Sequence, residues 1–166
     1  MKTAEYWIGQ LKLEKHPEGG CFSEHYRSSE LISRSALPER FSGDRVFSTC
    51  IYFLLTRGEF SAFHRIQQDE IWHFYDGASL YIHIIEPDGG YRKSILGCEP
   101  ESGAFPQVIV PAGAWFAAEP AENTDFCLCG CTVAPGFDFA DFEMPGAETL
   151  IAQFPNHSSL LERLGG

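Results

Sequence analysis

The residues best suited to chemistry gather in one stretch, between Gly58 and Gly77. His64 and Glu70 stand six positions apart there, and an imidazole with a carboxyl group can either ligate a metal ion or exchange protons with a substrate. The same two groups can also form a structural hydrogen bond. We take His64 and Glu70 as candidate catalytic residues, with His64 as the acid or base and Glu70 as the partner that orients it.

Short strands must position these side chains. The 14 Phe, 6 Tyr and 3 Trp, beside only 2 Met, favour strands, because aromatic side chains pack well on pleated surfaces. Strand-like runs punctuated by Gly, Pro and Asp cover residues 48–55, 60–66, 70–75, 80–86, 91–96, 107–110, 115–118 and 125–133. Because no helical pattern of about twelve residues separates them, they predict an all-β jelly roll or barrel rather than βαβ units.

Both ends of the chain carry short helical patterns. Residues 3–11 predict a helix with Thr3 as its N-cap. Residues 148–154 and 158–164 predict two more helices that pack outside the barrel, separated by Pro155. Between these ends, residues 21–28 predict a strand and residues 29–47 a surface loop or a ragged hairpin. No repeat or linker divides the chain, so residues 1–166 are predicted to form a single domain.

Charge and hydropathy exclude several partners. A formal charge of -11 repels phosphate backbones, and the 12 Lys and Arg residues form no stripe, so we expect no nucleic-acid partner. No apolar run approaches the roughly 20 residues that a membrane helix needs. The first ten residues also lack the basic-then-apolar order of a signal peptide. We therefore expect a soluble, cytoplasmic protein with no membrane partner.

Three of the six cysteines, Cys127, Cys129 and Cys131, alternate along one predicted strand. Residues two apart on a strand lie about 7 Å apart at Cα, which is beyond easy disulfide bridging. The same spacing prevents the three thiols from converging on one metal ion. We expect them to be reduced thiols in the core.

Two segments resemble the motifs of the cupin superfamily. Residues 58–70 (GEFSAFHRIQQDE), then six residues and Gly77, match G-x5-H-x-H-x3-E-x6-G except that Ile66 replaces the second histidine. Residues 111–116 (PAGAWF) match the core of the second motif, P-x-G-x2-H, with Phe116 in place of the last histidine. In cupins these motif residues surround a divalent metal. Two of the four ligands that the resemblance implies are therefore absent.

Nearly the whole chain resembles one subfamily, cupin-5, whose function is unknown. The resemblance rests on the segments HPEGG (16–20), IYFLL (51–55), DEIWHF (69–74), VPAGAW (110–115) and VAPGF (133–137). It implies a double-stranded β-helix, the cupin jelly-roll barrel, with a shape similar to sugar-nucleotide epimerases and germins. It also implies a homodimer, and the exposed strand edges of such a barrel need cover.

A metal cofactor is not favoured by this ligand set. One nitrogen and one carboxylate fall short of the three protein ligands of catalytic zinc. A divalent metal stays open as an alternative, held by His64, Glu70 and either His73 or His83 in an arrangement like a facial triad. Ideal alternation places His73 on the face opposite Glu70, and only a bulge would bring it back.

Replacing two imidazoles by Ile66 and Phe116 makes the predicted pocket apolar, which favours an organic ligand over an ion. Aromatic rings can stack on a planar or alicyclic ligand, and a glutamine can both donate and accept hydrogen bonds. The predicted ligand-binding residues are Tyr52, Trp72, Phe74, Gln107 and Phe116. Each aromatic residue has an ordinary place in the core as its alternative, and Gln107 has a place facing water.

A polar cluster marks the N-terminal segment. It consists of His16, Glu18, Glu24, Tyr26 and Arg27, and in a dimer it could cover a barrel mouth or the partner's sheet. Arg27 can hold a ligand carboxylate with two hydrogen bonds, or it can form a surface ion pair with Glu24.

These observations favour a homodimeric cupin that binds a small hydroxylated or cyclic organic molecule in the barrel. The leading hypothesis is a metal-independent isomerase or epimerase using His64 and Glu70, with Tyr52 or Tyr75 as a second acid. One alternative is a metal-dependent oxygenase or isomerase. The other is a non-catalytic barrel that binds, senses or stores its ligand.

Overall fold

The computed structural model describes residues 2–121 and 125–166, and strands are its commonest element. The helices and strands are α1 (Ala4–Leu11), β1 (Glu14–Lys15), β2 (Cys21–Arg27), β3 (Leu31–Ile32), η1 (Arg34–Ala36), β4 (Arg45–Val46), β5 (Thr49–Thr56), β6 (Ser61–His64), β7 (Asp69–Gly77), β8 (Leu80–Ile85), β9 (Tyr91–Leu96), η2 (Pro100–Ser102), β10 (Ala104–Phe105), β11 (Gln107–Val110), β12 (Trp115–Pro120), β13 (Phe126–Ala134), η3 (Phe139–Asp141), α2 (Ala147–Gln153), η4 (Pro155–His157) and α3 (Ser158–Leu164). The predicted all-β fold with short terminal helices is confirmed.

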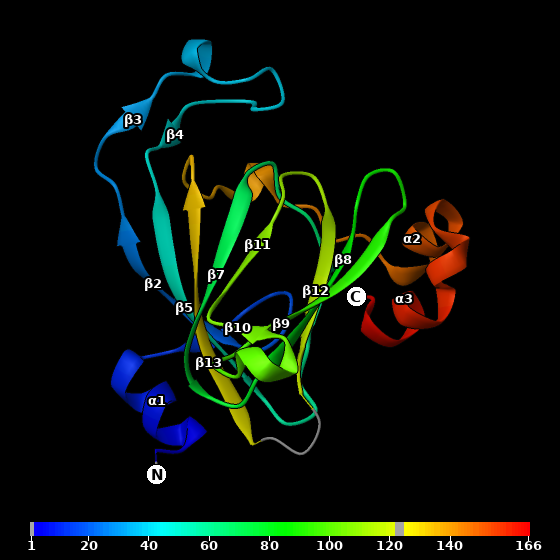
Figure 1. The fold of residues 1–166 in the computed structure, drawn as a ribbon. Helices are drawn as coiled ribbons and strands as arrows, with labels where there is room; N and C mark the ends of the chain where they lie inside the picture. Colours follow the sequence, from blue (N-terminus) through cyan, green and yellow to red (C-terminus); the bar gives the residue numbers. More distant parts are fainter. Residues whose placement is uncertain (1, 122–124) are drawn as a thin grey trace.

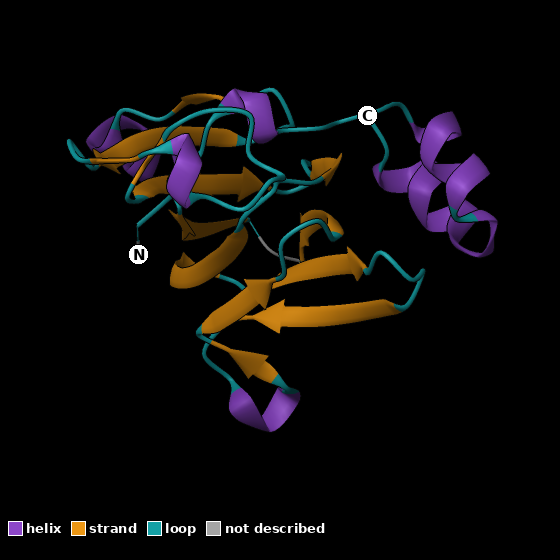
Figure 2. Cartoon of the chain, turned by 90° about the horizontal axis from the view of Figure 1, so that it is seen from above, coloured by secondary structure: helices purple, strands orange, loops and turns teal. Residues whose placement is uncertain are grey.

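Two sheets face one another and enclose the core (Figures 1 and 2). One has the strand order β1-β2-β5-β13-β7-β11 and the other β10-β9-β8-β12-β6. The described pairs are antiparallel except β9 with β10. This non-sequential antiparallel order is that of a jelly roll.

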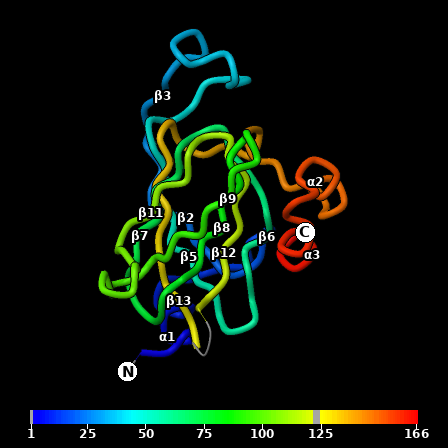
Figure 3. Tube along the Cα trace, turned by 45° about the vertical axis from the view of Figure 1, so that its right-hand side comes forward, coloured from blue at the N-terminus to red at the C-terminus, as the bar shows by residue number. Residues whose placement is uncertain are grey.

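The nine longer strands begin and end within two residues of their predicted positions. At the N-terminus, Thr3 caps α1 by accepting a hydrogen bond from the Tyr6 N–H at 3.2 Å. Residues 29–47 form a hairpin, in which β3 pairs with β4. Figure 3 shows this hairpin extending beyond one end of the two sheets.

The core follows the two-residue alternation of the strands. On β13, Cys127, Cys129 and Cys131 point between the sheets, whereas Phe126 and Leu128 point outward under α1. All six cysteines are free thiols, and Cys127, Cys129 and Cys131 are buried as predicted for these three. The inner cluster is completed by apolar residues of both sheets, including Phe53, Leu55, Trp72, Ile82, Ile84, Leu96, Val110 and Phe116.

Helices cover the outer face of each sheet. The apolar side of α1 packs on the six-stranded sheet, and α2 with α3 packs on the five-stranded sheet around Phe63, Ile85 and Trp115. α1 has eight residues and α2 and α3 have seven each. No helix in the described ranges is long and apolar enough to cross a membrane.

Gly77, which ends the motif stretch, is required by its backbone and its surroundings. Its φ of 92° lies in the left-handed region, and a Cβ atom there would stand 2.3 Å from the Phe126 carbonyl oxygen. Gly58, at the start of the same stretch, has a φ of 80° but no neighbour within 4 Å of a Cβ atom. A side chain at Gly58 would therefore meet backbone strain alone, whereas one at Gly77 would meet both strain and a steric clash.

We predict that Gly58→Ala lowers the free energy of unfolding by about 1 kcal/mol, which is the cost of a left-handed alanine. Gly77→Ala should lower it by about 3 kcal/mol or more, because β7 and β13 must also move apart. Urea unfolding of both variants measures the difference. Equal losses of unfolding free energy would show that the close approach of Gly77 to Phe126 adds nothing to the cost of the substitution.

Candidate functional site

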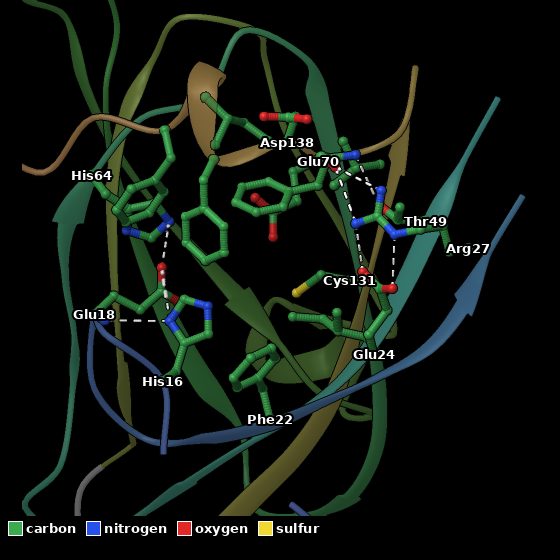
Figure 4. Close-up of a pocket in the computed structure, with 16 residues that line it drawn as sticks. His16, Glu18, Phe22, Glu24, Arg27, Thr49, His64, Glu70, Cys131 and Asp138 are labelled. Carbon is green, nitrogen blue, oxygen red and sulfur yellow. Dashed lines mark hydrogen bonds and ion pairs between the residues drawn. The ribbon is translucent and has the colours of Figure 1, made fainter. Parts of the chain in front are cut away.

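A cavity of about 380 Å³ opens at the end of the barrel where β7 begins and β13 ends. Figure 4 shows that the labelled polar side chains around it come from segments far apart in the chain. Its lining residues are His16, Glu18, Phe22, Glu24, Arg27, Thr49, Ile51, His64, Ile66, Glu70, Cys131, Val133, Phe137, Asp138, Phe139 and Phe142. The cavity thus combines an ionisable interior with largely apolar walls.

His64, the last residue of β6, is held at both ring nitrogens. Nδ1 donates to the Ala62 carbonyl oxygen at 2.7 Å, and Nε2 lies 2.9 Å from Oε2 of Glu18. A lowered pKa keeps Glu18 a carboxylate, so both ring nitrogens donate and His64 is an imidazolium. Burial lowers the pKa of His64, but the charge and hydrogen bond of Glu18 outweigh this and raise it above the usual range.

The turn that carries Glu18 is tied directly to β6. The Glu18 carbonyl oxygen accepts a hydrogen bond from the Ala62 N–H at 2.8 Å, and within the turn His16 N–H donates to Gly20 O at 3.0 Å. Burial raises the pKa of Glu18, but the neighbouring His64 charge and hydrogen bond lower it below the usual range. Glu18 and His64 therefore form a buried ion pair.

His16 contributes a second, uncharged imidazole to the cavity. Its Nδ1 accepts a hydrogen bond from the Glu18 backbone N–H at 3.3 Å, so the ring hydrogen of the neutral form lies on Nε2. Burial lowers the pKa of His16 more than the charge of Glu18 raises it. The ring also packs edge-to-face on Phe22, with centroids 4.5 Å apart. His16 thus offers a neutral N–H donor.

Glu70 lies at the start of β7 beside Val133 of β13 and is 8% exposed. The thiol of Cys131, a weak donor, lowers the pKa of this carboxyl group slightly. Burial raises the pKa of Glu70 to about 7, with the charge of Glu18 adding to this and the charge of His64 opposing it. Near neutral pH, Glu70 can therefore either give or take a proton.

An ion pair crosses the outer part of the cavity. Arg27 donates from Nε and Nη2 to the two carboxylate oxygens of Glu24 at 2.8 and 2.7 Å. Its Nη1 and Nη2 also reach the Phe137 carbonyl oxygen at 3.3 Å. The ion pair expected from sequence as one of two possibilities is thus present, and it holds the segment after β13 against β2.

That segment supplies the aromatic wall. The rings of Phe137, Phe139 and Phe142 pack edge-to-face, with centroids 5.0 to 6.2 Å apart. A buried ion pair anchors their backbone, since Arg45 Nε donates to Asp141 Oδ2 at 2.7 Å. The wall therefore rests on a fixed element rather than on a free loop.

Two predicted ligand-binding aromatic residues, Trp72 and Phe74, lie deeper along the face of β7 that carries Glu70. Trp72 is 1% exposed and packs edge-to-face on Phe116. Phe116 is fully buried opposite His64, with ring centroids 4.1 Å apart. These three residues pack in the core of the barrel and do not line the cavity. The cavity reaches only the beginning of β7, where Glu70 lies.

Three other predicted residues lie on outward faces. Tyr52 packs under α1. Gln107 donates to Nδ1 of His73 at 3.2 Å, and Nε2 of His73 lies 3.0 Å from the Thr132 hydroxyl. Alternation along β5, β7 and β11 turns all of them away from the cavity. His83, considered as a metal ligand, bonds Tyr91 and Glu119 instead.

The carboxylate that orients His64 is Glu18, not Glu70, which reaches His64 only through space. The HPEGG segment was a usable signal, because it places an acid beside paired glycines that allow a tight turn. No sequence signal placed Cys131 or the Phe137–Phe142 wall in the lining of the cavity. Cysteine and phenylalanine side chains are usually buried, so both are expected in the core.

The residues present do not fit a divalent metal. Ile66 and Phe116 carry no donor atom, and Nε2 of His64 is already bonded to Oε2 of Glu18 at 2.9 Å. Among residues 2–121 and 125–166, no group of three or more His, Cys, Asp or Glu side chains is placed to hold a metal ion. The chemistry derived below therefore rests on the side chains alone.

Comparison with known proteins places this geometry in context. An uncharacterised protein of Saccharomyces cerevisiae, YML079W, is 32% identical over 143 residues, which covers 81% of this chain and 71% of the yeast protein. Protein SO0799 of Shewanella oneidensis has a structure similar at a TM-score of 0.90, with 38% identity, covering 100% of this chain and 99% of that one. A hypothetical protein from Leishmania major gives 0.91, with 34% identity and 99% of both chains covered.

A more distant similarity concerns the fold alone. Oxalate decarboxylase of Bacillus subtilis, an enzyme described with Mn(II) centres, matches at a TM-score of 0.56 and 13% identity, covering 96% of this chain and 38% of the enzyme. The family model described as "Cupin superfamily (DUF985)" matches residues 5–145. The chain therefore belongs to this cupin family, within the jelly-roll fold that its strands build.

Proposed function

We propose that the protein binds a small hydroxylated or cyclic organic molecule in the cavity and catalyses a metal-independent isomerisation or epimerisation of it. The observation that carries this proposal is Glu70, a carboxyl group buried in the cavity wall near the Glu18–His64 ion pair, whose pKa burial raises to about 7. A group poised near the working pH is suited to moving a proton both ways.

The neighbouring groups divide the remaining work. The imidazole ring of His64, which Glu18 holds in place, acts on Glu70 through its positive charge, while the charge of Glu18 partly offsets it, so the pair tunes the proton affinity of Glu70. His16 supplies a neutral N–H that can hold a ligand oxygen. Glu70 is thus the acid–base residue in this mechanism, and His64 an electrostatic partner.

The walls favour an organic ligand with an apolar face. Ile51, Ile66 and Val133 line one part of the cavity and phenylalanine rings another. A cavity of about 380 Å³ lies within the size range of small-molecule sites. A ring with hydroxyl groups along one edge matches this division into apolar walls and a polar interior.

The direct test is exchange of hydrogen with solvent. We expect incubation with hydroxylated ring compounds in D2O to place deuterium at one carbon of a bound ligand, as mass spectrometry detects. Glu70→Gln should slow this exchange by about 10²-fold or more while the ligand still binds. Glu59→Gln, which removes a carboxylate paired with Lys15 outside the cavity, is the matched control.

Two other outcomes would contradict this assignment. Ligand binding without exchange, altered equally by Glu70→Gln and His64→Gln, would indicate a binding, sensing or storage barrel. Near-stoichiometric Fe, Mn, Ni or Zn in protein purified without chelator, with exchange lost on its removal, would indicate a metal-dependent oxygenase or isomerase.

Glu70 also predicts a pH dependence of stability. Its folded pKa, about 7, lies above the ordinary value of 4.5, so the native state binds more protons than the unfolded state between these values. The free energy of unfolding should therefore fall as pH rises from about 4.5 to about 7, by roughly 2–3 kcal/mol from this group. Glu70→Gln should remove that slope in urea unfolding measured across this range, and an unchanged slope would assign it to other groups.

We further propose a homodimer that uses the surface of β2 and the β3–β4 hairpin. Tyr26, Leu31 and Phe47 there are 51%, 61% and 47% exposed, and adjoining apolar side chains on a surface favour association. Sedimentation at micromolar concentration should give twice the 18.6 kDa chain mass, and Leu31→Asp should reduce it to the monomer. Ile109→Asp, on the opposite edge strand, should leave the dimer intact. A monomeric wild type would refute this.

A further inference from the structure

The charges that line the cavity are unequal in number. Four carboxyl groups face two cations, Arg27 and His64, while His16 is neutral. The carboxyl groups are Glu18, Glu24, Glu70 and Asp138. Whether an incoming anion finds a partner therefore depends on whether either cation is free.

Arg27 is not free. Both carboxylate oxygens of Glu24 accept from it, the Phe137 carbonyl oxygen accepts from two of its nitrogens, and the negative charge of Asp138 acts on it as well. A bidentate pair of this kind uses the fork geometry that would otherwise bind a ligand carboxylate or phosphate. An anionic ligand would have to displace Glu24.

His64 is not free either. Both of its N–H groups are used, one by Glu18 and one by the Ala62 carbonyl oxygen. Taking its proton or its partner away would leave Glu18 as a buried, unpaired charge, which is costly. The cavity therefore presents no unpaired positive charge to a ligand.

Two acidic groups remain without a cation of their own. They are Glu70, which is buried beside the Cys131 thiol, and Asp138, whose Oδ1 accepts a hydrogen bond from the Ala140 backbone N–H at 2.8 Å. Asp138 stands between the two aromatic residues Phe137 and Phe139, whose ring faces attract cations. The formal charge of the whole chain, -11, adds a long-range field of the same sign.

Resting on the function proposed above, we infer that the cavity selects uncharged or cationic hydroxylated ring compounds and rejects anionic ones. Carboxylates, phosphates and nucleotide-linked sugars are thereby outside its substrate class. Oxalate, a dianion named in the distant structural neighbour, is outside it too. The chain shares its fold with that enzyme. The charges of this cavity nevertheless oppose the binding of a dianion.

Four probes of graded charge test this inference by equilibrium binding without turnover. They are cyclohexylammonium, cyclohexanol, cyclohexanecarboxylate and oxalate, each titrated at millimolar concentration into the full chain while amide resonances of cavity residues are followed by NMR. We expect the first two to bind and the two anions to bind about tenfold more weakly or worse, because like charges oppose them.

A gain of function makes the test sharper. Glu24→Gln keeps the shape of the side chain but removes the charge that occupies Arg27, so it should raise the affinity for cyclohexanecarboxylate about tenfold. Glu143→Gln is the matched control, since Glu143 pairs with Arg65 at 2.8 Å and neither residue lines the cavity. The control variant should bind all four probes as the wild type does.

The outcomes separate the two proposals. If cyclohexanecarboxylate or oxalate binds the wild type as tightly as cyclohexanol, charge selection is overturned while the cavity stays a ligand site. If Glu24→Gln and Glu143→Gln bind cyclohexanecarboxylate equally well, the pairing of Arg27 with Glu24 does not keep anions out, and the inference also fails. If none of the four probes shifts the cavity resonances, both the selection and the proposed ligand site are contradicted.

Discussion

The buried hydrogen-bonded ion pair between Glu18 and His64 is the interaction on which the arrangement of the cavity depends. Two charges removed from water are stable only when they are well paired and their remaining hydrogen-bonding groups are satisfied. Here His64 has a second acceptor in Ala62, and the turn that carries Glu18 is bonded to the same strand. The pair therefore fixes the N-terminal turn against β6 and fixes the charge state of the imidazole at the same time.

That pairing determines what the other polar groups can do. Because Glu18 keeps His64 protonated, His64 cannot serve as a neutral base. Glu70, whose pKa is raised to about 7, is the cavity residue that can exchange a proton near neutral pH. Because Glu24 occupies Arg27 in the same way, the second cation is also used within the protein. The cavity is thus rich in charged residues, yet among them only the carboxyl groups of Glu70 and Asp138 are left without a cation.

Much of the fold could be predicted from sequence, because the signals are local. Gly77, Pro155 and Thr3 mark boundaries through backbone geometry, and alternation assigns the faces of β13 and places His73 outside. The cavity was harder to predict, since its parts come from segments far apart in the chain. Glu18 reaches His64 across 46 positions through a turn whose direction depends on tertiary contacts. Trp72 and Phe74 lie on the predicted face, but no sequence pattern tells how deep along a barrel a side chain sits.

Ile66 and Phe116, which replace two histidines of the cupin motifs, can be related to the presence of Glu18 beside His64. A histidine that shares a metal with other ligands is neutral and is held by the metal. With Ile66 and Phe116 at two ligand positions, an imidazole in this place would be buried beside apolar groups with its Nε2 unsatisfied, which is costly. Glu18 supplies both the hydrogen-bond acceptor and the countercharge. A carboxylate from the N-terminal turn thus satisfies an imidazole that apolar side chains surround.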